Sequence, residues 1–244
     1  MRVGIFADIH GNLAALRAVL AILMEEGAER VVCLGDVAAT GPHPHESLAL
    51  LREGGCPVVM GNADAALLEP PAADEGADDD ARRIADIDRW CADQLTEADR
   101  RFVATFRPTV EIALGSGQTL LCCHGSPRSF DDAIAADTPA DELDRMLDEN
   151  AAELVACGHT HLRLLRRHRS GEIVNPGSVG LAYAFLPTGG VRVPPWAEFA
   201  IVDALPHGPL AVAFRRVDYD QAATVRAMTE RGMPHAAWWA GEWG

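Results

Sequence analysis

The chain has 244 residues, 48% of them hydrophobic, which is enough to bury a sizeable core in one large domain or two small ones. It carries 36 acidic and 21 basic residues, all of the latter arginine, for a formal net charge of −15. Because nucleic acids and anionic membranes bind to basic surfaces, this balance argues against bulk nucleic-acid binding and against membrane-surface binding.

The N-terminal part of the chain predicts a strand, a helix and a second strand. An apolar run over residues 3–7 is followed by Asp8 and His10. Residues 13–26 then carry apolar side chains at helical spacing, and the next apolar run covers residues 30–34. Two strands joined by a helix in this way form a βαβ unit, so this part of the sheet is expected to be parallel.

Further apolar runs also end in polar residues that suit a functional site. The runs at 57–60, 118–123 and 154–157 each stop at an Asn or His residue, as the run at 30–34 stops at an Asp. Because ligand-binding groups gather at the carboxyl ends of parallel strands, we expect these side chains to lie together. The residues delivered by the five strand ends are Asp8, His10, Asp36, Asn62, His124, His159 and His161.

These seven residues predict a metal centre. Imidazoles mixed with carboxylates suit first-row divalent ions such as Mn, Fe, Ni, Co or Zn. Seven ligands are too many for one ion, but they fit two ions that share a bridging carboxylate, as in two-metal phosphoryl-transfer sites. Two divalent ions also reverse the sign of the local field, so an acidic chain can still bind a small phosphorylated substrate.

The order and spacing of the motifs resemble the calcineurin-like metallophosphoesterases over residues 3–180. Shorter stretches make the chain similar to the small, single-domain bacterial and archaeal phosphodiesterase branch of that family. The motifs that carry the likeness are Asp8-x-His10-Gly11-Asn12, Gly35-Asp36, Gly41-Pro42, Gly61-Asn62, His124-Gly125-Ser126-Pro127-Arg128, Gly158-His159-Thr160-His161 and Asn175-Pro176-Gly177-Ser178-Val179. Each motif alone is weak, but their shared order makes a strong signal.

The resemblance implies an α/β (α+β) fold, a four-layer αββα sandwich of two mixed β-sheets flanked by helices. We expect a single domain over residues 1–244, with an acidic loop at 69–80 and a helical segment at 81–104 inserted beside the site. The loop is expected to be solvated and mobile, with a lid over the metals as the alternative. The helical segment is expected to break near Thr96, a candidate N-cap.

A two-metal hypothesis assigns roles to these residues. One ion is held by Asp8, His10 and His161, and the second by Asn62, His124 and His159. Asp36 bridges the two, and a hydroxide between the ions attacks phosphorus in line with the leaving oxygen. Manganese is the first expectation for the metal. Asp36, Asn62 and His124 are the candidate catalytic residues.

Two positions depart from the family pattern, and they limit which phosphoesterase reactions are expected. Ala63 stands where many relatives have a His that is implied to protonate the leaving group, a function typically worth about 10²–10⁴-fold in rate. Met60 stands where protein phosphatases of the superfamily place an Arg, which counts against a protein phosphatase. Some small members of the family that resemble this chain also lack that His and are associated with phosphodiester hydrolysis, so the resemblance makes a phosphodiesterase the leading prediction. The alternatives are a hydrolase of nucleotide phosphoanhydrides, such as a dinucleoside tetraphosphate, and a non-catalytic scaffold like the phosphoesterase-like retromer subunit.

Arg128, Asn62 and Asn12 are the candidate substrate contacts. Arg128 lies four residues beyond His124, and its planar guanidinium suits phosphate oxygens. His43 and His45 lie on a Gly- and Pro-containing loop and are expected to be solvated, with additional metal ligands or substrate contacts as the alternative.

The rest of the chain predicts helices, hairpins and a supporting turn. The strand pairs suggest a second sheet packed on the first, and the turn at 175–180 is expected to support the ligand loops by backbone hydrogen bonds. Helices are predicted at 46–53, 139–150 and 219–231, and hairpins at 109–123, 162–175 and 198–217.

Two remaining features bear on location and assembly. The six cysteines show no Cys-x-x-Cys spacing, so we expect buried, reduced thiols. With no apolar stretch of membrane-span length and no signal peptide pattern, we expect a cytoplasmic protein. The tryptophans Trp238, Trp239 and Trp243 near the C-terminus are expected to pack on their own domain, with a homo-oligomer interface as the alternative.

Overall fold

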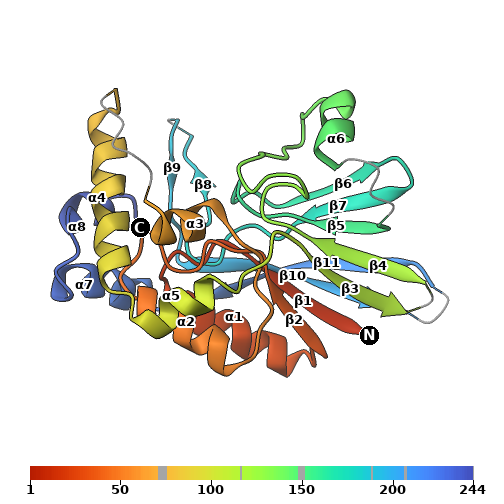
Figure 1. Cartoon of the computed structure of the whole chain (residues 1–244), viewed down its shortest axis with the longest axis horizontal. Helices are drawn as coiled ribbons and strands as arrows, with labels where there is room; N and C mark the ends of the chain where they lie inside the picture. Colours follow the sequence, from red (N-terminus) through yellow and green to blue (C-terminus); the bar gives the residue numbers. More distant parts are fainter. Residues whose placement is uncertain (71–75, 116, 148–151, 188, 206–207, 244) are drawn as a thin grey trace.

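The computed structural model describes residues 1–70, 76–115, 117–147, 152–187, 189–205 and 208–243. Two large mixed sheets pack against each other, and helices cover their outer faces (Figure 1). Three separate apolar cores lie between the layers: one between helices and the first sheet, one between the sheets, and one outside the second sheet. Three cores between four layers confirm the predicted αββα sandwich.

The first sheet has the strand order β11-β10-β1-β2. Strand β1 (Arg2–Phe6) runs parallel to β2 (Arg30–Cys33) and antiparallel to β10 (Trp196–Ala204), which pairs with β11 (Leu210–Asp218). Helix α1 (Leu13–Glu25) connects β1 to β2 and buries its apolar face, as its spacing predicts. The βαβ unit therefore forms as expected.

The second sheet has the order β3-β4-β5-β7-β6. Its central strands β4, β5 and β7 are parallel, and β3 and β6 are antiparallel edge strands. Helix α6 (Ala140–Leu147) covers the outer face with Leu143, Met146 and Leu147, and residues 148–150 of the predicted helix lie outside the described residues. The strands are β3 (Val110–Gly115), β4 (Gln118–Cys122), β5 (Leu154–Ala156), β6 (Leu164–His168) and β7 (Gly171–Asn175).

Two expectations about the sheets were wrong. The hairpin at 198–217 does not belong to the second sheet, because β10 pairs with β1 and so extends the first one. The apolar run at 57–60 makes only isolated bridges, from Val58 to Cys33 and from Val59 to Arg107. This run still leads into the site, because helix α3 (Asn62–Leu68) begins directly after it.

The segment between the first sheet and the second is helical, as predicted. Helix α4 (Asp79–Asp93) is followed by α5 (Glu97–Val103), and the Thr96 side chain caps α5 through a reciprocal capping box with Asp99. The predicted acidic loop ends earlier than expected, because Asp79 and Asp80 form the first turn of α4, where carboxylates are favoured. Residues 71–75 of that loop lie outside the described residues.

The remaining elements are a short hairpin and helices outside the two large sheets (Figure 1). The short hairpin β8 (Ala184–Phe185) and β9 (Val191–Arg192) rises between α4 and the second sheet, and the sequence did not predict it. Helix α2 (Pro44–Glu53) and helix α7 (Gln221–Glu230) match predicted segments, and α8 (Ala236–Ala240) carries two of the tryptophans.

The C-terminal tryptophans and the cysteines lie where the sequence places them. Trp238, Trp239 and Trp243 pack partly buried against the first core, and the Trp239 indole donates a hydrogen bond to the Thr40 carbonyl. All six cysteines are buried free thiols. No helix among the described residues is long and apolar enough to span a membrane.

Candidate metal centre

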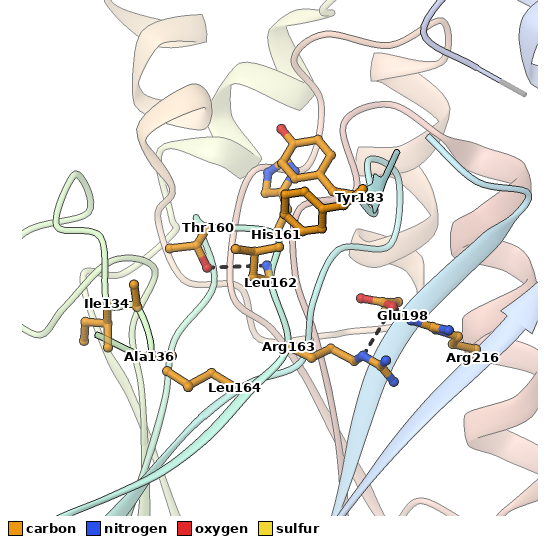
Figure 2. A pocket seen from close by; sticks show the side chains of 12 residues that line it. Ile134, Ala136, Thr160, His161, Leu162, Arg163, Leu164, Tyr183, Glu198 and Arg216 are labelled. Atoms are coloured by element: carbon orange, nitrogen blue, oxygen red, sulfur yellow. Dashed lines mark hydrogen bonds and ion pairs between the residues drawn. The ribbon is translucent and has the colours of Figure 1, made fainter. Parts of the chain in front are cut away.

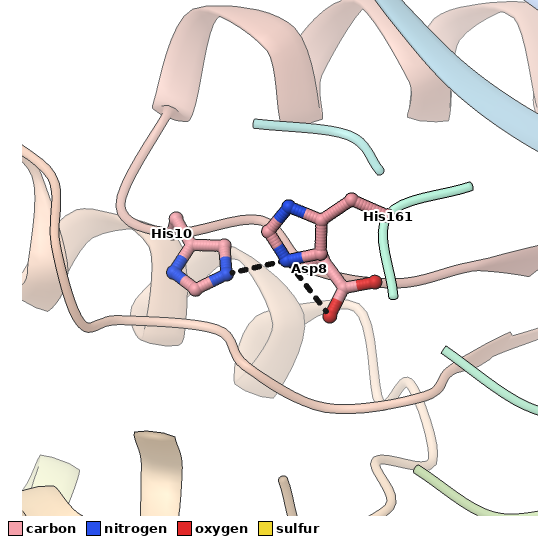
Figure 3. Close-up of side chains that lie close together, drawn as sticks. All are labelled: Asp8, His10 and His161. Carbon is pink, nitrogen blue, oxygen red and sulfur yellow. Dashed lines mark hydrogen bonds and ion pairs between the residues drawn. The ribbon is translucent and has the colours of Figure 1, made fainter. Parts of the chain in front are cut away.

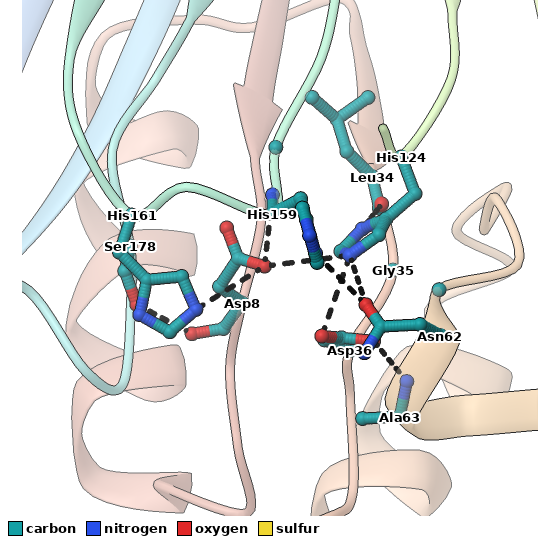
Figure 4. Close-up of polar contacts among 12 residues, drawn as sticks. Asp8, Leu34, Gly35, Asp36, Asn62, Ala63, His124, His159, His161 and Ser178 are labelled. Atoms are coloured by element: carbon teal, nitrogen blue, oxygen red, sulfur yellow. Dashed lines mark hydrogen bonds and ion pairs between the residues drawn. The ribbon is translucent and has the colours of Figure 1, made fainter. Parts of the chain in front are cut away.

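The predicted ligands come from strand ends in both sheets and meet at one edge of the sandwich (Figure 4). Asp8 and His10 follow β1, and Asp36 follows β2, all in the first sheet. His124 follows β4, and the His-x-His pair follows β5, in the second sheet. Asn62 opens helix α3. The sequence predicted one shared edge, whereas the structure forms it from the facing edges of two sheets.

Five of the ligand candidates have a left-handed backbone conformation. Their φ angles lie between 46° and 68°, although none is glycine. Asp and His tolerate this region better than branched residues, but each still costs about 1–3 kcal/mol. The tight bend turns each side chain sharply out of its strand and toward the others. These residues are Asp8, His10, Asp36, His159 and His161.

Asp8, His10 and His161 form the first ligand group, whose candidate ligand atoms lie within 4.8 Å of one another (Figure 3). The Nε2 atoms of the two histidines are 3.2 Å apart, and His161 Nε2 is 3.6 Å from Asp8 Oδ1. Each Nδ1 faces a backbone carbonyl, at 3.3 Å for His10 and 2.9 Å for His161. A carbonyl only accepts hydrogen bonds, so Nδ1 carries the proton and Nε2 presents a lone pair.

The protonation of the first group suits a cation. Burial lowers the pKa of His161 to about 3 and that of His10 below its usual value, so both rings are neutral near pH 7. Two lone pairs then face each other across 3.2 Å, and a bound cation removes that repulsion. Burial also raises the pKa of Asp8 to about 8, and its Oδ2 is buried with no hydrogen-bond partner in the described structure. This donor set fits a divalent metal.

Asp36, His124 and His159 form the second ligand group, also within 4.8 Å. His124 Nε2 lies 3.3 Å from Asp36 Oδ2. Asn62 Oδ1 lies 3.0 Å from His124 Nε2 and 2.9 Å from His159 Nδ1, so the Asn completes this group (Figure 4). The other nitrogen of His124 faces the Leu34 carbonyl at 2.7 Å.

The second group compensates its own charge in the absence of metal. Burial disfavours the His124 imidazolium, but the Asp36 carboxylate outweighs this and raises the pKa of His124 to about 10. Burial likewise opposes ionisation of Asp36, yet His124 and then His10 hold the Asp36 pKa below its usual range. A proton on His124 Nε2 thus occupies the direction in which a metal would bind.

Asp36 lies between the two groups. Its Oδ2 is 3.3 Å from His124 Nε2 in the second group and 3.9 Å from His10 Nε2 in the first. Its Oδ1 accepts a hydrogen bond of 2.9 Å from the Ala63 backbone. A carboxylate in this position is able to contact ions in both groups.

Outer hydrogen bonds hold the ligand loops in place. Ser178 Oγ donates to the Asp8 carbonyl at 2.8 Å, and Asn175 Nδ2 donates to the Gly158 carbonyl at 2.6 Å. The backbone N–H groups of Val179 and Gly180 also donate to the Ala7 and Asp8 carbonyls, both at 2.9 Å, which confirms that the turn at 175–180 supports the ligand loops by backbone hydrogen bonds. The buried Asp64 carboxylate accepts hydrogen bonds from the Asp36 and Val37 backbone at 2.7 and 2.9 Å. The contact between Asp64 and the Asp36 backbone was not predicted from the sequence. The only hint was that Asp64 lies two residues after the ligand candidate Asn62.

The structure gives Asn12 a different role from the predicted substrate contact. Its side chain is fully buried, caps α1 by accepting from Ala15 N, and accepts from Thr224 Oγ1 at 3.1 Å. Its amide also donates to the Gly180 carbonyl. Because every polar atom of this side chain is used inside the fold, we do not retain Asn12 as a substrate contact.

Other candidates lie outside both ligand groups. Arg128 forms a two-point ion pair with Asp132, at 2.7 and 3.2 Å, and remains partly exposed. His45 Nδ1 contacts Asp99, and neither it nor His43 belongs to a ligand group among the described residues. A contact that the sequence analysis missed is Tyr183, whose ring stacks on His161 with centroids 5.0 Å apart.

Known proteins resemble this chain in sequence and in fold. An uncharacterized protein of Methanocaldococcus jannaschii is 25% identical over 255 residues, covering 98% of this chain and 96% of that protein. The crystal structure of a metallophosphoesterase from Sphaerobacter thermophilus has a TM-score of 0.74 at 27% identity, covering 98% of both chains. A hypothetical protein from Pyrococcus horikoshii OT3 has a TM-score of 0.79 at 22% identity, covering 96% of this chain and 94% of that one, and shares the fold.

The family model for the calcineurin-like phosphoesterase superfamily domain matches residues 1–192. This range contains both ligand groups and the turn that supports them. Members of the family bind divalent metals, and the donor sets described above fit such ions. The chain belongs to the calcineurin-like phosphoesterase superfamily.

Proposed function

We propose that the protein is a dinuclear, metal-dependent phosphodiesterase. The observation that carries this proposal is the position of Asp36, whose carboxylate faces a histidine of each ligand group at 3.3 and 3.9 Å. A shared carboxylate between two donor sets is the arrangement used by two-metal phosphoryl-transfer sites. Asp8, His10 and His161 would hold one ion, and Asn62, His124 and His159 the other, with Mn²⁺ as the first ion to test.

Bound ions would activate water and neutralise the charge of a phosphate group. The chain's own residues position these components. The carbonyl contacts of His10, His124 and His161 keep each Nε2 directed into the site. With Asn62 Oδ1 engaged, its amino group is left to donate to a phosphate oxygen, where negative charge grows during the reaction.

The side chain at position 63 favours substrates whose leaving group departs without being protonated by the protein. Ala63 contributes only its backbone N–H, to Asp36, and has no proton to give to a departing oxygen. General-acid help is typically worth about 10²–10⁴-fold, so substrates with acidic leaving groups lose least without it. A nucleotide phosphoanhydride has such a leaving group, which supports it as the second candidate substrate, whereas the first place of the diester rests on the resemblance to the small phosphodiesterase branch.

Hydrolysis of bis-p-nitrophenyl phosphate and p-nitrophenyl phosphate, with Mn²⁺ and with a chelator, tests the proposal. We expect chelator-sensitive activity that favours the diester. A preference for the monoester would contradict it, and turnover of a dinucleoside tetraphosphate alone would select the anhydride. Loss of all turnover in protein that contains no metal would select the non-catalytic scaffold.

The variant Asp36→Asn gives a residue-level test. Removing the shared carboxylate is expected to lower the metal content below two ions per chain and kcat/KM by at least about 100-fold. Asp99→Asn is the matched control, since Asp99 is a fully buried carboxylate paired with His45 and Arg52 outside both ligand groups. Metal analysis and turnover are measured on both. Two bound ions with full activity in Asp36→Asn would refute the assignment.

A further inference from the structure

A pocket of about 390 Å³ opens beside the first ligand group (Figure 2). His161 of the first ligand group is one of its lining residues, so the pocket lies next to the metal centre. The lining comes from segments 134–136 and 160–164, from Tyr183 and Phe185 at the start of the β8–β9 hairpin, and from the paired residues Glu198 of β10 and Arg216 of β11. Its volume lies within the range of about 300–1,000 Å³ that is typical of small-ligand sites.

The rim of the pocket is an exposed apolar and aromatic surface. Leu162, Tyr183 and Phe185 are 39%, 37% and 69% exposed, which is high for side chains of this type. The Tyr183 ring stacks on the His161 ring at an interplanar angle of 28°. A planar group bound here would therefore extend an aromatic surface that begins at a ligand of the metal centre.

The opposite wall is positive. Arg163 Nε lies 3.3 Å and Arg216 Nε 2.9 Å from Glu198 Oε1, so two guanidinium groups share one carboxylate. Each guanidinium also lies over an aromatic ring, Arg163 over Phe214 at 5.8 Å and Arg216 over Trp196 at 4.8 Å to the ring centroid. The terminal nitrogens make no hydrogen bond to another described residue, so their N–H groups, which lie in the guanidinium plane, can still donate to an anion. In a chain with a net charge of −15, this wall carries two arginines and one glutamate and so has a local excess of positive charge.

We propose that this pocket binds a nucleotide arm of the substrate. The nucleobase lies against Tyr183 and Phe185, and a second phosphate on the same nucleotide meets Arg163 and Arg216. Aromatic faces stack on any base, and arginine forks match phosphate oxygens. The inference rests on the proposed function in one respect: the phosphate to be cleaved sits at the two ligand groups.

A second pocket on the other side of the site lacks this combination. It has a volume of about 370 Å³ and is lined by Phe130 and Arg128. The Arg128 guanidinium is already neutralised by the two-point ion pair with Asp132, and Phe130 is 37% exposed. Phe130 therefore serves as a matched control for Phe185.

Three substrates with the same p-nitrophenol leaving group test the proposal. They carry a methyl arm, a thymidine 5′ arm, or a thymidine 5′ arm with a 3′-phosphate. We expect kcat/KM to rise on the order of ten-fold with the thymidine arm and again several-fold with the 3′-phosphate. Phe185→Ala should reduce the thymidine-to-methyl ratio by on the order of ten-fold, and Phe130→Ala should leave it unchanged.

Arg216 is tested separately through the increment from the 3′-phosphate. Arg216→Met should remove that increment and keep the thymidine preference, while Arg216→Lys should restore part of it. Glu198 keeps Arg163 as its partner in both variants, and melting temperatures establish that each folds. A 3′-phosphate increment that survives Arg216→Met would contradict the anion assignment.

A binding measurement separates this inference from the proposed function. Thymidine 3′,5′-bisphosphate is titrated calorimetrically into the protein, and its affinity should fall in Phe185→Ala and not in Phe130→Ala. If none of the three substrates is hydrolysed but this pattern holds, the reaction is wrong and the pocket assignment stands. If the thymidine arm brings no gain, or if Phe130→Ala removes it instead, the pocket assignment is overturned.

Discussion

The two ligand groups reach charge balance in opposite ways. In the group of Asp8, His10 and His161, burial keeps both imidazoles neutral, and their Nε2 atoms oppose each other at 3.2 Å. In the group around Asp36 and His124, an ionised carboxylate and a protonated imidazole satisfy each other. The first group therefore holds two imidazole lone pairs beside an Asp8 carboxyl that is mostly protonated at pH 7, whereas the second holds an ion pair whose imidazolium must lose its proton before His124 binds a metal.

Removal of one histidine from each group is expected to have the largest effect. His161→Ala and His159→Ala should each leave one of the two metal ions bound and lower kcat/KM by at least about 100-fold, because even outer partners of ligands cost about 10–100-fold. His168→Ala is the control, since His168 pairs with Asp144 outside both groups. Metal analysis and diester turnover measure the effect. If His161→Ala still bound two ions, the assignment of a separate ion to each ligand group would be contradicted.

A smaller effect is expected on the pH dependence of metal binding, because the ligand groups release protons when they bind an ion. The pKa of His124 is raised to about 10 and that of Asp8 to about 8, so both are mostly protonated at pH 7 in metal-free protein. Their deprotonated forms bind metal, so loading should release about two protons and the affinity for Mn²⁺ should rise as the pH increases from 6 to 8. Calorimetric titration in buffers with different ionisation enthalpies counts these protons. Release of none would contradict the charge difference between the groups.

The smallest effects are expected from the hydrogen bonds behind the ligands. Ser178→Ala removes the donor to the Asp8 carbonyl, and Asn175→Ala removes the donor to the Gly158 carbonyl, next to His159. Each should weaken metal binding by about ten-fold, the first variant at the first group and the second at the second group. Competition with a chelator measures both affinities. Equal weakening of both sites by Ser178→Ala would show that the groups are not independently supported.

Much of the fold could be read from the sequence because its signals are local. Apolar runs, the helical spacing of 13–26 and the capping box at Thr96 each depend on neighbouring residues. The partners of β10 depend on contacts between distant residues, since it pairs with β1 about 200 residues away, and hairpin patterns carry no information on which sheet they join. The β8–β9 hairpin has only two residues per strand, too few for an alternating pattern.

In the candidate site, too, local sequence signals predicted some features, whereas contacts between distant residues were not predicted. Asp8, Asp36 and the His-x-His pair follow strands, so chain order alone indicated that they belong together. Asn12 follows one of these motifs, but its side chain turns inward, where it caps α1 and also accepts a hydrogen bond from Thr224, more than 200 residues away. The stacking of Tyr183 on His161 and the shared Glu198 carboxylate likewise arise from the packing of separate strands.

The left-handed backbone of five ligand residues has an evolutionary consequence. Glycine at any of these positions would relieve about 1–3 kcal/mol of strain, so selection for a stable fold alone would favour its appearance there. This chain carries Asp or His at all five positions, as the proposed metal centre requires. A descendant that abandoned this chemistry would be expected to accumulate Gly or Asn at residues 8, 10, 36, 159 and 161 and to become more stable as it did so.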